Sequence, residues 1–277
     1  MNDAETQTVS FYSQHPISTR IILEKLRASR GDLNSLKPEE LWAHDQDHFG
    51  GTPATDELAR ETHIGPGTEV VDFCAGLGGT VRYLAHRYAA IVTGIELTPV
   101  RVAGAEELTN LVGLQKTSHV LHGDITNVPL RSESFDVVIS QEAFCHVPNL
   151  RRAMLEAFRL LRKGGRLGFT DWIANAPLAS QDAELMWDGI AIQPLQNIQG
   201  YQALVGEAGF KIQTVEDLTQ KWSPILTDRL RMYQRLRDEA RLIGTPIGSD
   251  AFHQAYTRVV ELIQNGTLGG IRLIAIK

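Results

Sequence analysis

The stretch Val70-Val71-Asp72-Phe73-Cys74-Ala75-Gly76-Leu77-Gly78-Gly79-Thr80 decides the fold class of this chain. It begins with a short β-branched run, which predicts a strand buried on both faces, and the residues that follow it predict a helix. The glycines between them carry no Cβ atom, so the backbone can turn tightly and a ligand can approach it closely. The stretch therefore predicts a strand, a ligand-binding turn and a helix, which together open an α/β fold.

Short apolar runs alternate with helix-length segments from here to the end of the chain, which predicts a doubly wound parallel sheet. The runs are residues 69–73, 90–95, 118–121, 135–139, 166–170, 210–215 and 270–276. Two amphipathic helical patterns lie between the last two runs. Because open α/β sheets bind ligands at the carboxyl edge of their strands, we predict this helical pair as a lid over that edge.

The composition narrows the class of protein. Of 277 residues, 43% are hydrophobic and 22% are charged, so the chain can bury a sizeable core and does not resemble a disordered one. The net charge of −6 argues against a nucleic-acid binder. We find no apolar stretch long enough to span a bilayer and no secretory-signal pattern. The two cysteines, Cys74 and Cys145, cannot form a disulfide framework, and we expect a cytoplasmic protein.

A glycine-rich turn of this kind holds either the pyrophosphate of a dinucleotide or the methionine portion of S-adenosylmethionine (SAM). Glu96 ends the second predicted strand, where a carboxylate can accept from both ribose hydroxyls of either cofactor. Asp124 ends the third, where it can accept from an adenine amino group while Ile125 packs on the ring. Asp72 precedes the glycines, where an anion would repel a pyrophosphate but suits a sulfonium compound that carries an ammonium group. These positions favour SAM.

The fingerprint of dinucleotide-binding proteins fails in detail. After Gly76 and Gly78, Val81 occupies the position of its third glycine. Short-chain dehydrogenases have a tyrosine followed four residues later by a lysine, and none of the six tyrosines here has a lysine at that position. An NAD(P)-binding Rossmann oxidoreductase nevertheless remains the alternative from another class of enzyme, and a protein that binds SAM without turnover is a further one.

The ordered motifs resemble those of class I SAM-dependent methyltransferases over roughly residues 40–276. The matching segments are residues 71–78, 94–98, 123–125, 135–146 and 161–166. The resemblance implies a Rossmann-like, seven-stranded sheet whose last strand is antiparallel, SAM as cofactor and S-adenosylhomocysteine as product. One departure is Cys74, which stands where the family usually has the first glycine of the turn.

Residues 45–55, Asp-Gln-Asp-His-Phe-Gly-Gly-Thr-Pro-Ala-Thr, resemble a segment of the sarcosine and dimethylglycine N-methyltransferases. The segment is also similar to phosphobase methyltransferases and, more loosely, to sugar O-methyltransferases of antibiotic pathways. In such enzymes it folds over the cofactor. The resemblance implies an amine acceptor such as sarcosine or dimethylglycine; a hydroxyl of a sugar or aromatic natural product comes second, and a carbon nucleophile third.

We predict one methyltransferase domain over residues 1–277. It comprises a helical N-terminal cap (1–62), a SAM-binding core (63–216 and 270–277) and the helical lid (217–269). The expected partner is a small-molecule acceptor, with no nucleic acid and no membrane, and a homodimer is left open.

His146 follows the fourth strand, where the carboxyl edge faces the transferred methyl group, and we predict that it acts as base or orients the substrate. Gln141, from the same strand, is predicted to contact the methionine end of the cofactor or the substrate, whereas Glu142 is expected as an acid at a helix N-terminus. Each polar group has a structural alternative, a side chain that only bonds to nearby backbone. His44 and His48 lie four residues apart without a third ligand cluster, so we predict no metal.

The predicted site has two parts. The residues expected to bind the cofactor are Asp72, Phe73, Gly76, Gly78, Glu96, Leu97, Asp124, Ile125, Gln141, His48 and Gly51. Those expected to reach the substrate are Tyr12, Trp172, Trp187 and Trp222. The tryptophans could surround a cationic amine by cation–π attraction or instead form the core of the lid. One of the arginines between Arg229 and Arg241 could meet a substrate carboxylate, although a solvated helix face explains most of them.

Overall fold

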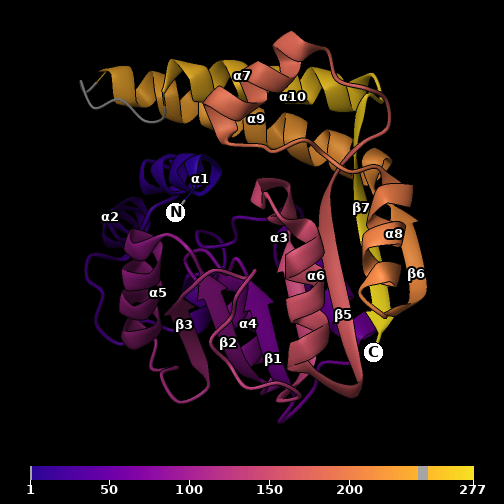
Figure 1. The fold of residues 1–277 in the computed structure, drawn as a ribbon. Coiled ribbons are helices and arrows are strands. Elements are labelled where there is room, and N and C mark those ends of the chain that lie inside the picture. Colours follow the sequence, from indigo (N-terminus) through magenta and orange to yellow (C-terminus); the bar gives the residue numbers. More distant parts are fainter. Residues whose placement is uncertain (1, 243–248) are drawn as a thin grey trace.

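A seven-stranded sheet forms the centre of the computed structural model, which describes residues 2–242 and 249–277 (Figure 1). The strands are β1 (Glu69–Phe73), β2 (Ile91–Glu96), β3 (Ser118–His122), β4 (Phe135–Gln141), β5 (Leu161–Ala174), β6 (Lys211–Asp217) and β7 (Leu268–Ile276). Their order is β3-β2-β1-β4-β5-β7-β6. β7 runs antiparallel to both of its neighbours, whereas the pairs among β1 to β5 are parallel. The predicted fold class, with its antiparallel last strand, is confirmed.

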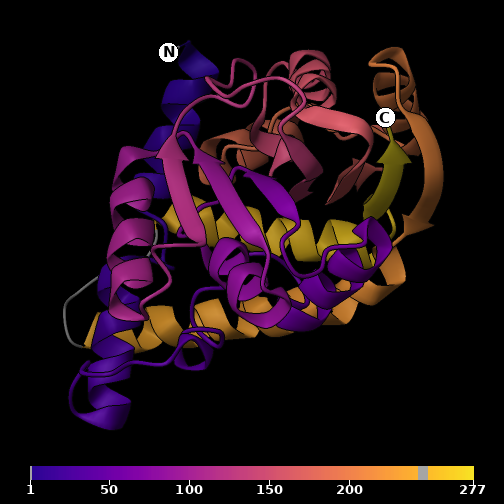
Figure 2. The same cartoon turned by 90° about the horizontal axis from the view of Figure 1, so that it is seen from below.

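Helices cover the sheet on both faces and above its carboxyl edge (Figures 1 and 2). They are α1 (Asp3–Ser13), α2 (Thr19–Arg30), the 3₁₀ turn η1 (Pro38–Glu40), α3 (Gly51–Thr62), α4 (Gly79–Tyr88), α5 (Pro99–Leu111), the 3₁₀ turn η2 (Phe144–His146), α6 (Leu150–Leu160), α7 (Ser180–Ile190), α8 (Ile198–Glu207), α9 (Thr219–Leu242) and α10 (Asp250–Gln264). Within the described part of the chain, none of these helices is long and apolar enough to cross a membrane.

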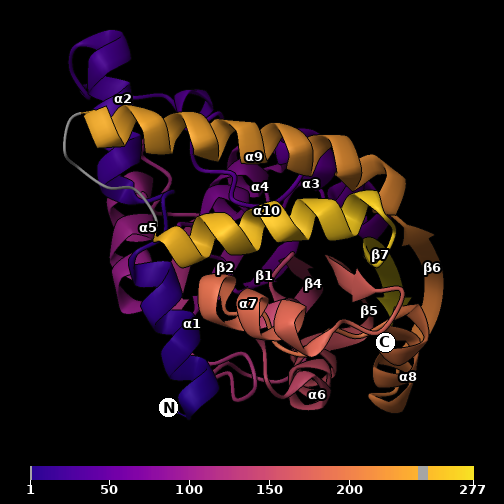
Figure 3. The same ribbon diagram turned by 90° about the horizontal axis from the view of Figure 1, so that it is seen from above.

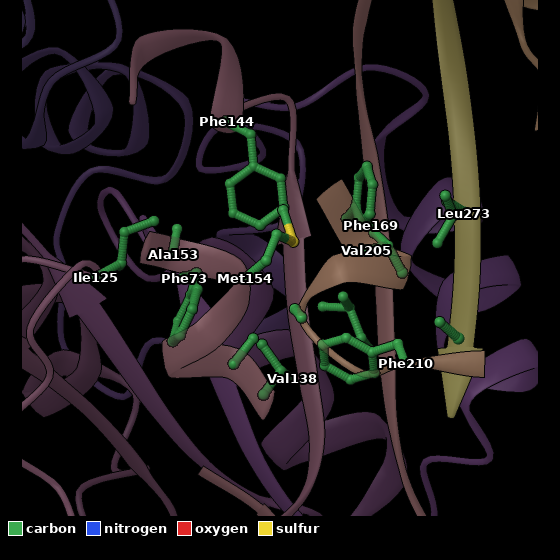
Figure 4. Close-up of a cluster of buried hydrophobic side chains, with 14 of the residues drawn as sticks. Phe73, Ile125, Val138, Phe144, Ala153, Met154, Phe169, Val205, Phe210 and Leu273 are labelled. Carbon is green, nitrogen blue, oxygen red and sulfur yellow. The ribbon is translucent and has the colours of Figure 1, made fainter. Parts of the chain in front are cut away.

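The central strands lack polar alternation because both faces of the sheet are buried there. The edge strands β3 and β6 have several exposed positions, so burial on both faces is wrong for the predicted run 118–121. Val70 and Val137 point to one hydrophobic cluster, which includes apolar residues of α3 and α4. Their neighbours Val71 and Val138 point to the other cluster, with residues of α6 and α8. Figure 4 shows this second cluster, in which Phe144 and Phe169 meet edge to face with ring centroids 5.1 Å apart. Burial on both faces is what the continuous β-branched runs predicted.

The lid consists of α9 and α10, which lie side by side above the sheet and connect β6 to β7 (Figure 3). α7 packs along α10 and completes this layer. Trp222 of α9 packs directly on Gly270, where any Cβ would overlap its indole ring. Residues 243–248, within the predicted lid, lie outside the described residues. β5 is longer than the predicted run 166–170, because β7 pairs with it from Arg166 to Ala174.

An ion pair fixes the N-terminal segment to the core. Nη2 of Arg82, on α4, lies 2.9 Å from Oδ2 of Asp45, and the two side chains are 1% and 0% exposed. The segment passes so close to α4 that a Cβ on Gly79 would overlap the Asp45 carbonyl oxygen. The glycine at the start of α4 is therefore required by this close approach.

Replacing Asp45 by Ala should destabilise the protein by about 3–5 kcal/mol, because it leaves the Arg82 guanidinium buried without a counter-charge. Urea unfolding measures the loss. The matched control is Glu24→Ala, which breaks the surface ion pair between Arg20 and Glu24. Because these side chains are 62% and 52% exposed, the control should leave the unfolding midpoint nearly unchanged. Equal stability of the two variants would show that the buried pair does not anchor the segment.

Candidate active site

A cavity lies above the carboxyl ends of the strands, between the sheet, the N-terminal segment and the lid. Its floor includes Asp72, Cys74, Gly76, Glu96, Leu97, Asp124, Ile125 and Gln141. Its walls include Tyr12, His15, Asp47, His48, Trp172, Arg229, Tyr233, Phe252 and Tyr256. The fold thus gathers residues from both ends of the chain around the edge at which open α/β sheets bind ligands.

Glu96 and Asp124 present carboxylates to this cavity from the ends of neighbouring strands. Glu96 accepts hydrogen bonds from the backbone N–H groups of Gly76 (2.9 Å) and Thr98 (2.8 Å). Asp124 accepts from the backbone N–H of Thr126 at 2.8 Å and from its hydroxyl at 2.6 Å. Because each carboxylate oxygen can accept more than one hydrogen bond, both groups keep acceptor capacity for ribose hydroxyls and an adenine amino group.

The glycine turn has the left-handed backbone that glycine tolerates best, with φ of +56° at Gly76 and +74° at Gly78. Cys74 also adopts a positive φ, of +63°. The turn therefore keeps a glycine-like backbone conformation at Cys74, although cysteine replaces the first glycine of the family pattern there.

Asp72 is buried between the turn and Glu96. Burial, and secondly the charge of Glu96, raise the pKa of the Asp72 carboxyl to about 8. At pH 7 the group is therefore mostly protonated, and a cation beside it would favour the ionised form.

Tyr12 and His146 meet inside the cavity. The Tyr12 hydroxyl lies 2.9 Å from Nε2 of His146, and Nδ1 of the same ring lies 3.0 Å from the carbonyl oxygen of Ala191. A carbonyl only accepts, so Nδ1 carries the proton, and Nε2 accepts from the Tyr12 hydroxyl. Burial lowers the pKa of His146 to about 4, so the ring is neutral at pH 7.

Gln141 and His48 belong to a polar network beneath this pair. The Gln141 side chain accepts from the hydroxyls of Thr80 (3.0 Å) and Thr55 (3.3 Å), and its amide lies 3.2 Å from Nδ1 of His48. Nε2 of His48 lies 2.9 Å from Oε1 of Gln46. The network ties the segment after Asp45 to the end of β4, and both residues line the cavity.

Several residues predicted for the site do not line the cavity. Phe73 is fully buried in the hydrophobic core, and Trp222 packs between Phe49, Trp172 and Gly270 in the lid. The others outside the lining are Gly51, Gly78 and Trp187. Of the three tryptophans predicted to reach the substrate, Trp172 is the one that lines the cavity.

Arg101 and Glu142 are two charged residues of the cavity that had no predicted binding or catalytic role. Arg101 of α5 forms an ion pair with Asp47 and lies with its Cζ 4.9 Å from the centre of the Tyr12 ring. Glu142 does not start a long helix; it has a positive φ and accepts from the Phe49 backbone N–H and the Thr170 hydroxyl, each at 2.5 Å. Burial raises its pKa to about 7. The sequence offered one signal for both residues: Arg101 follows the motif that contains Glu96, and Glu142 directly follows Gln141.

Comparison with known proteins agrees with this geometry. A family model described as a methyltransferase domain matches residues 71–169. A sarcosine/dimethylglycine N-methyltransferase from Halorhodospira halochloris is 30% identical over 176 residues, which are 64% of this chain and 61% of that enzyme. A glycine/sarcosine/dimethylglycine N-methyltransferase from Actinopolyspora halophila is 31% identical over 163 residues, 59% of this chain and 29% of that one. The chain thus spans less than two thirds of either relative.

Relatives with a different acceptor also match. The 24-methylenesterol C-methyltransferase 2 of Arabidopsis thaliana is 25% identical over 245 residues, 81% of this chain and 66% of that enzyme. Among solved structures, a putative sarcosine dimethylglycine methyltransferase from Galdieria sulphuraria has the same fold, with a TM-score of 0.73, 20% identity and coverage of 82% and 83% of the two chains. From the family model, the relatives and the fold, we conclude that this chain carries a class I SAM-dependent methyltransferase domain.

Proposed function

We propose that the chain transfers the methyl group of SAM to a small molecule, and that the acceptor is an amine of the sarcosine or dimethylglycine type. The N-methyltransferase relatives and the segment of residues 45–55 support this acceptor. The floor of the cavity suits the cofactor: Asp72 would face its ammonium group, Glu96 its ribose hydroxyls and Asp124 its adenine. SAM, when bound, supplies a methyl group on a sulfonium, which a correctly placed nucleophile can displace.

The Tyr12–His146 hydrogen bond is the observation that supports catalysis rather than binding alone. A proton that leaves the acceptor can pass to the Tyr12 oxygen while the Tyr12 proton passes to Nε2 of His146. The Ala191 carbonyl holds the other ring nitrogen in its protonated form throughout. The pair is neutral at pH 7 and can therefore accept a proton without first losing one.

An O-methyltransferase acting on a sugar or aromatic natural product is the second candidate. A hydroxyl must lose its proton during or before methyl transfer, and the Tyr12–His146 pair is a route for that proton. An amine can instead lose its proton to water before it binds. The oxidoreductase alternative has no comparable support, because the family model over the glycine turn is that of a methyltransferase.

Replacement of His146 by Ala distinguishes these acceptors. For a hydroxyl acceptor, kcat should fall by roughly 10²- to 10⁴-fold; for sarcosine or dimethylglycine it should fall by only about tenfold, through lost orientation. Affinity for SAM should stay nearly intact. Because the pKa of His146 is about 4, the ratio of wild-type to variant kcat should stay constant from pH 6 to 9.

Tyr12→Phe tests the other half of the pair, since it keeps the ring over Arg101 and removes only the hydroxyl. We expect it to reproduce most of the His146→Ala loss on the same acceptor. Full activity of both variants on every acceptor tested would leave the pair with a structural role only.

The pKa of Asp72 gives a prediction for cofactor binding. The carboxyl is mostly protonated in the free protein at pH 7, and the ammonium group of S-adenosylhomocysteine favours its ionised form. Binding should therefore release a proton, and affinity should rise from pH 6 to pH 8 and level off above. Calorimetry in buffers of different ionisation enthalpy measures the release. Asp72→Asn should abolish this proton release. Equal proton release by wild type and variant would show that Asp72 does not interact with the bound cofactor.

A further inference from the structure

Arg229, on the lid helix α9, brings a positive charge into the cavity. Its Nη1 donates to the carbonyl oxygen of Asp47 at 2.5 Å, and its Nη2 donates to that of His48 at 2.8 Å. Its Cζ lies 5.0 Å from the centre of the Phe49 ring. The Tyr233 side chain also interacts with this guanidinium. A guanidinium has five N–H donors, so these contacts hold the group in place and leave donors for a ligand.

Among the described residues, the Arg229 guanidinium makes no ion pair of its own, although the nearby charges of Asp47 and Glu142 act on it and, against its burial, contribute to raising its pKa. Over residues 2–242 and 249–277, no carboxylate lies within ion-pair distance of its guanidinium. The two nearby acids are engaged elsewhere, since Asp47 pairs with Arg101, and Glu142 accepts from Phe49 and Thr170. A desolvated cation without a counter-charge is costly, and buried charges in proteins are normally paired. The other cation of the cavity, Arg101, follows that rule.

Tyr256, on α10, adds an independent observation. It lines the cavity and is 7% exposed, and its hydroxyl is a buried polar group without a hydrogen-bond partner among the described residues. Burial holds the pKa of this hydroxyl well above its ordinary value, so it stays a neutral donor. Buried hydroxyls are almost always hydrogen-bonded, which points to a partner that a ligand supplies.

We propose that Arg229 and Tyr256 form a subsite for a carboxylate on the methyl acceptor. This inference rests on the proposed methyltransferase function and specifies its substrate as an anionic small molecule. The carboxylate would accept from the free donors of Arg229 and from the Tyr256 hydroxyl. Phe252 and Trp172 provide apolar wall around the rest of the acceptor.

The methionine carboxylate of the cofactor is the other possible source of the anion, and the placement of Arg229 argues against it. Arg229 and Tyr256 both come from the lid, whereas the residues suited to the cofactor lie on the floor, around Gly76 and Glu96. There a second arginine, Arg101, lies next to Gly76 and has a buried Nε without a partner. The floor therefore has a guanidinium donor of its own for the cofactor, unpartnered among the described residues, although the charge of Arg101 is paired with Asp47.

Binding of matched ligand pairs tests the proposal. The full chain, saturated with S-adenosylhomocysteine, is titrated with dimethylglycine against 2-(dimethylamino)ethanol, and with 4-hydroxybenzoate against 4-hydroxybenzyl alcohol. We expect the carboxylate of at least one pair to bind about 10- to 100-fold more tightly than its alcohol. Arg229→Met should abolish this preference and Tyr256→Phe should reduce it several-fold. Arg231→Met, on the exposed side of the same helix, should keep it.

The outcomes separate the sources of the anion. Absence of a carboxylate preference in the wild type, or its persistence in Arg229→Met, would overturn the subsite. Weaker binding of S-adenosylhomocysteine by Arg229→Met, with unchanged binding of 5′-methylthioadenosine, would assign Arg229 to the cofactor and overturn it too. Because Tyr256→Phe alters a single hydroxyl, it tests the subsite even if Arg229→Met does not fold. Failure of the wild type to bind S-adenosylhomocysteine would instead refute the proposed function itself.

Discussion

The ion pair between Arg82 and Asp45 anchors the segment on which the closed cavity is built. With Asp45 held on α4, the residues that follow it pass close to the glycine turn. Three other elements bind these residues. Arg101 of α5 pairs with Asp47, Arg229 of the lid binds the carbonyl groups of Asp47 and His48, and Glu142 at the end of β4 binds the Phe49 N–H. Core, N-terminal segment and lid thus meet on one short stretch of chain.

Burial of the titratable side chains that line the cavity shifts their pKa values. Burial lowers the pKa of His15, His48 and His146 to about 4 and raises that of Asp72 to about 8. These three histidines and the Asp72 carboxyl are therefore mostly neutral at pH 7. The arginines keep their charge, and so does Asp47, whose pKa is lowered to about 2 beside His15, Arg101 and Arg229 despite its burial. A ligand entering the cavity therefore meets neutral histidines, a protonated Asp72, and two arginines beside the ionised Asp47.

The two halves of the cavity have different origins. The floor consists of strand ends and the glycine turn, which belong to the core that the methyltransferase family model matches. The walls come from α1, α9 and α10, which lie outside the matched residues. Relatives that methylate amino acids and relatives that methylate sterol carbon match the same chain. The matched core therefore does not identify the acceptor, since function belongs to the site and not to the fold.

The sequence by itself determined the strands, the glycine turn and the carboxylates at the strand ends. These follow from local patterns: a β-branched run forms a buried strand, and the residue that ends a parallel strand must lie at the carboxyl edge, as Asp72, Glu96 and Gln141 do. Seven strands could therefore be placed. Three predicted cofactor residues, Phe73, Gly78 and Gly51, do not line the cavity, and Phe73 points instead to the hydrophobic core.

The tertiary structure decided which distant side chains meet. Nothing in the local pattern pairs Tyr12 with His146, places Arg229 on the Asp47 and His48 carbonyl groups or buries Trp222 against Gly270. Each contact depends on how a helix packs across the sheet edge, and helical periodicity predicts which face of a helix is apolar but not the neighbour that this face meets. The sequence thus determined the floor of the cavity, and packing between segments remote in sequence determined its walls.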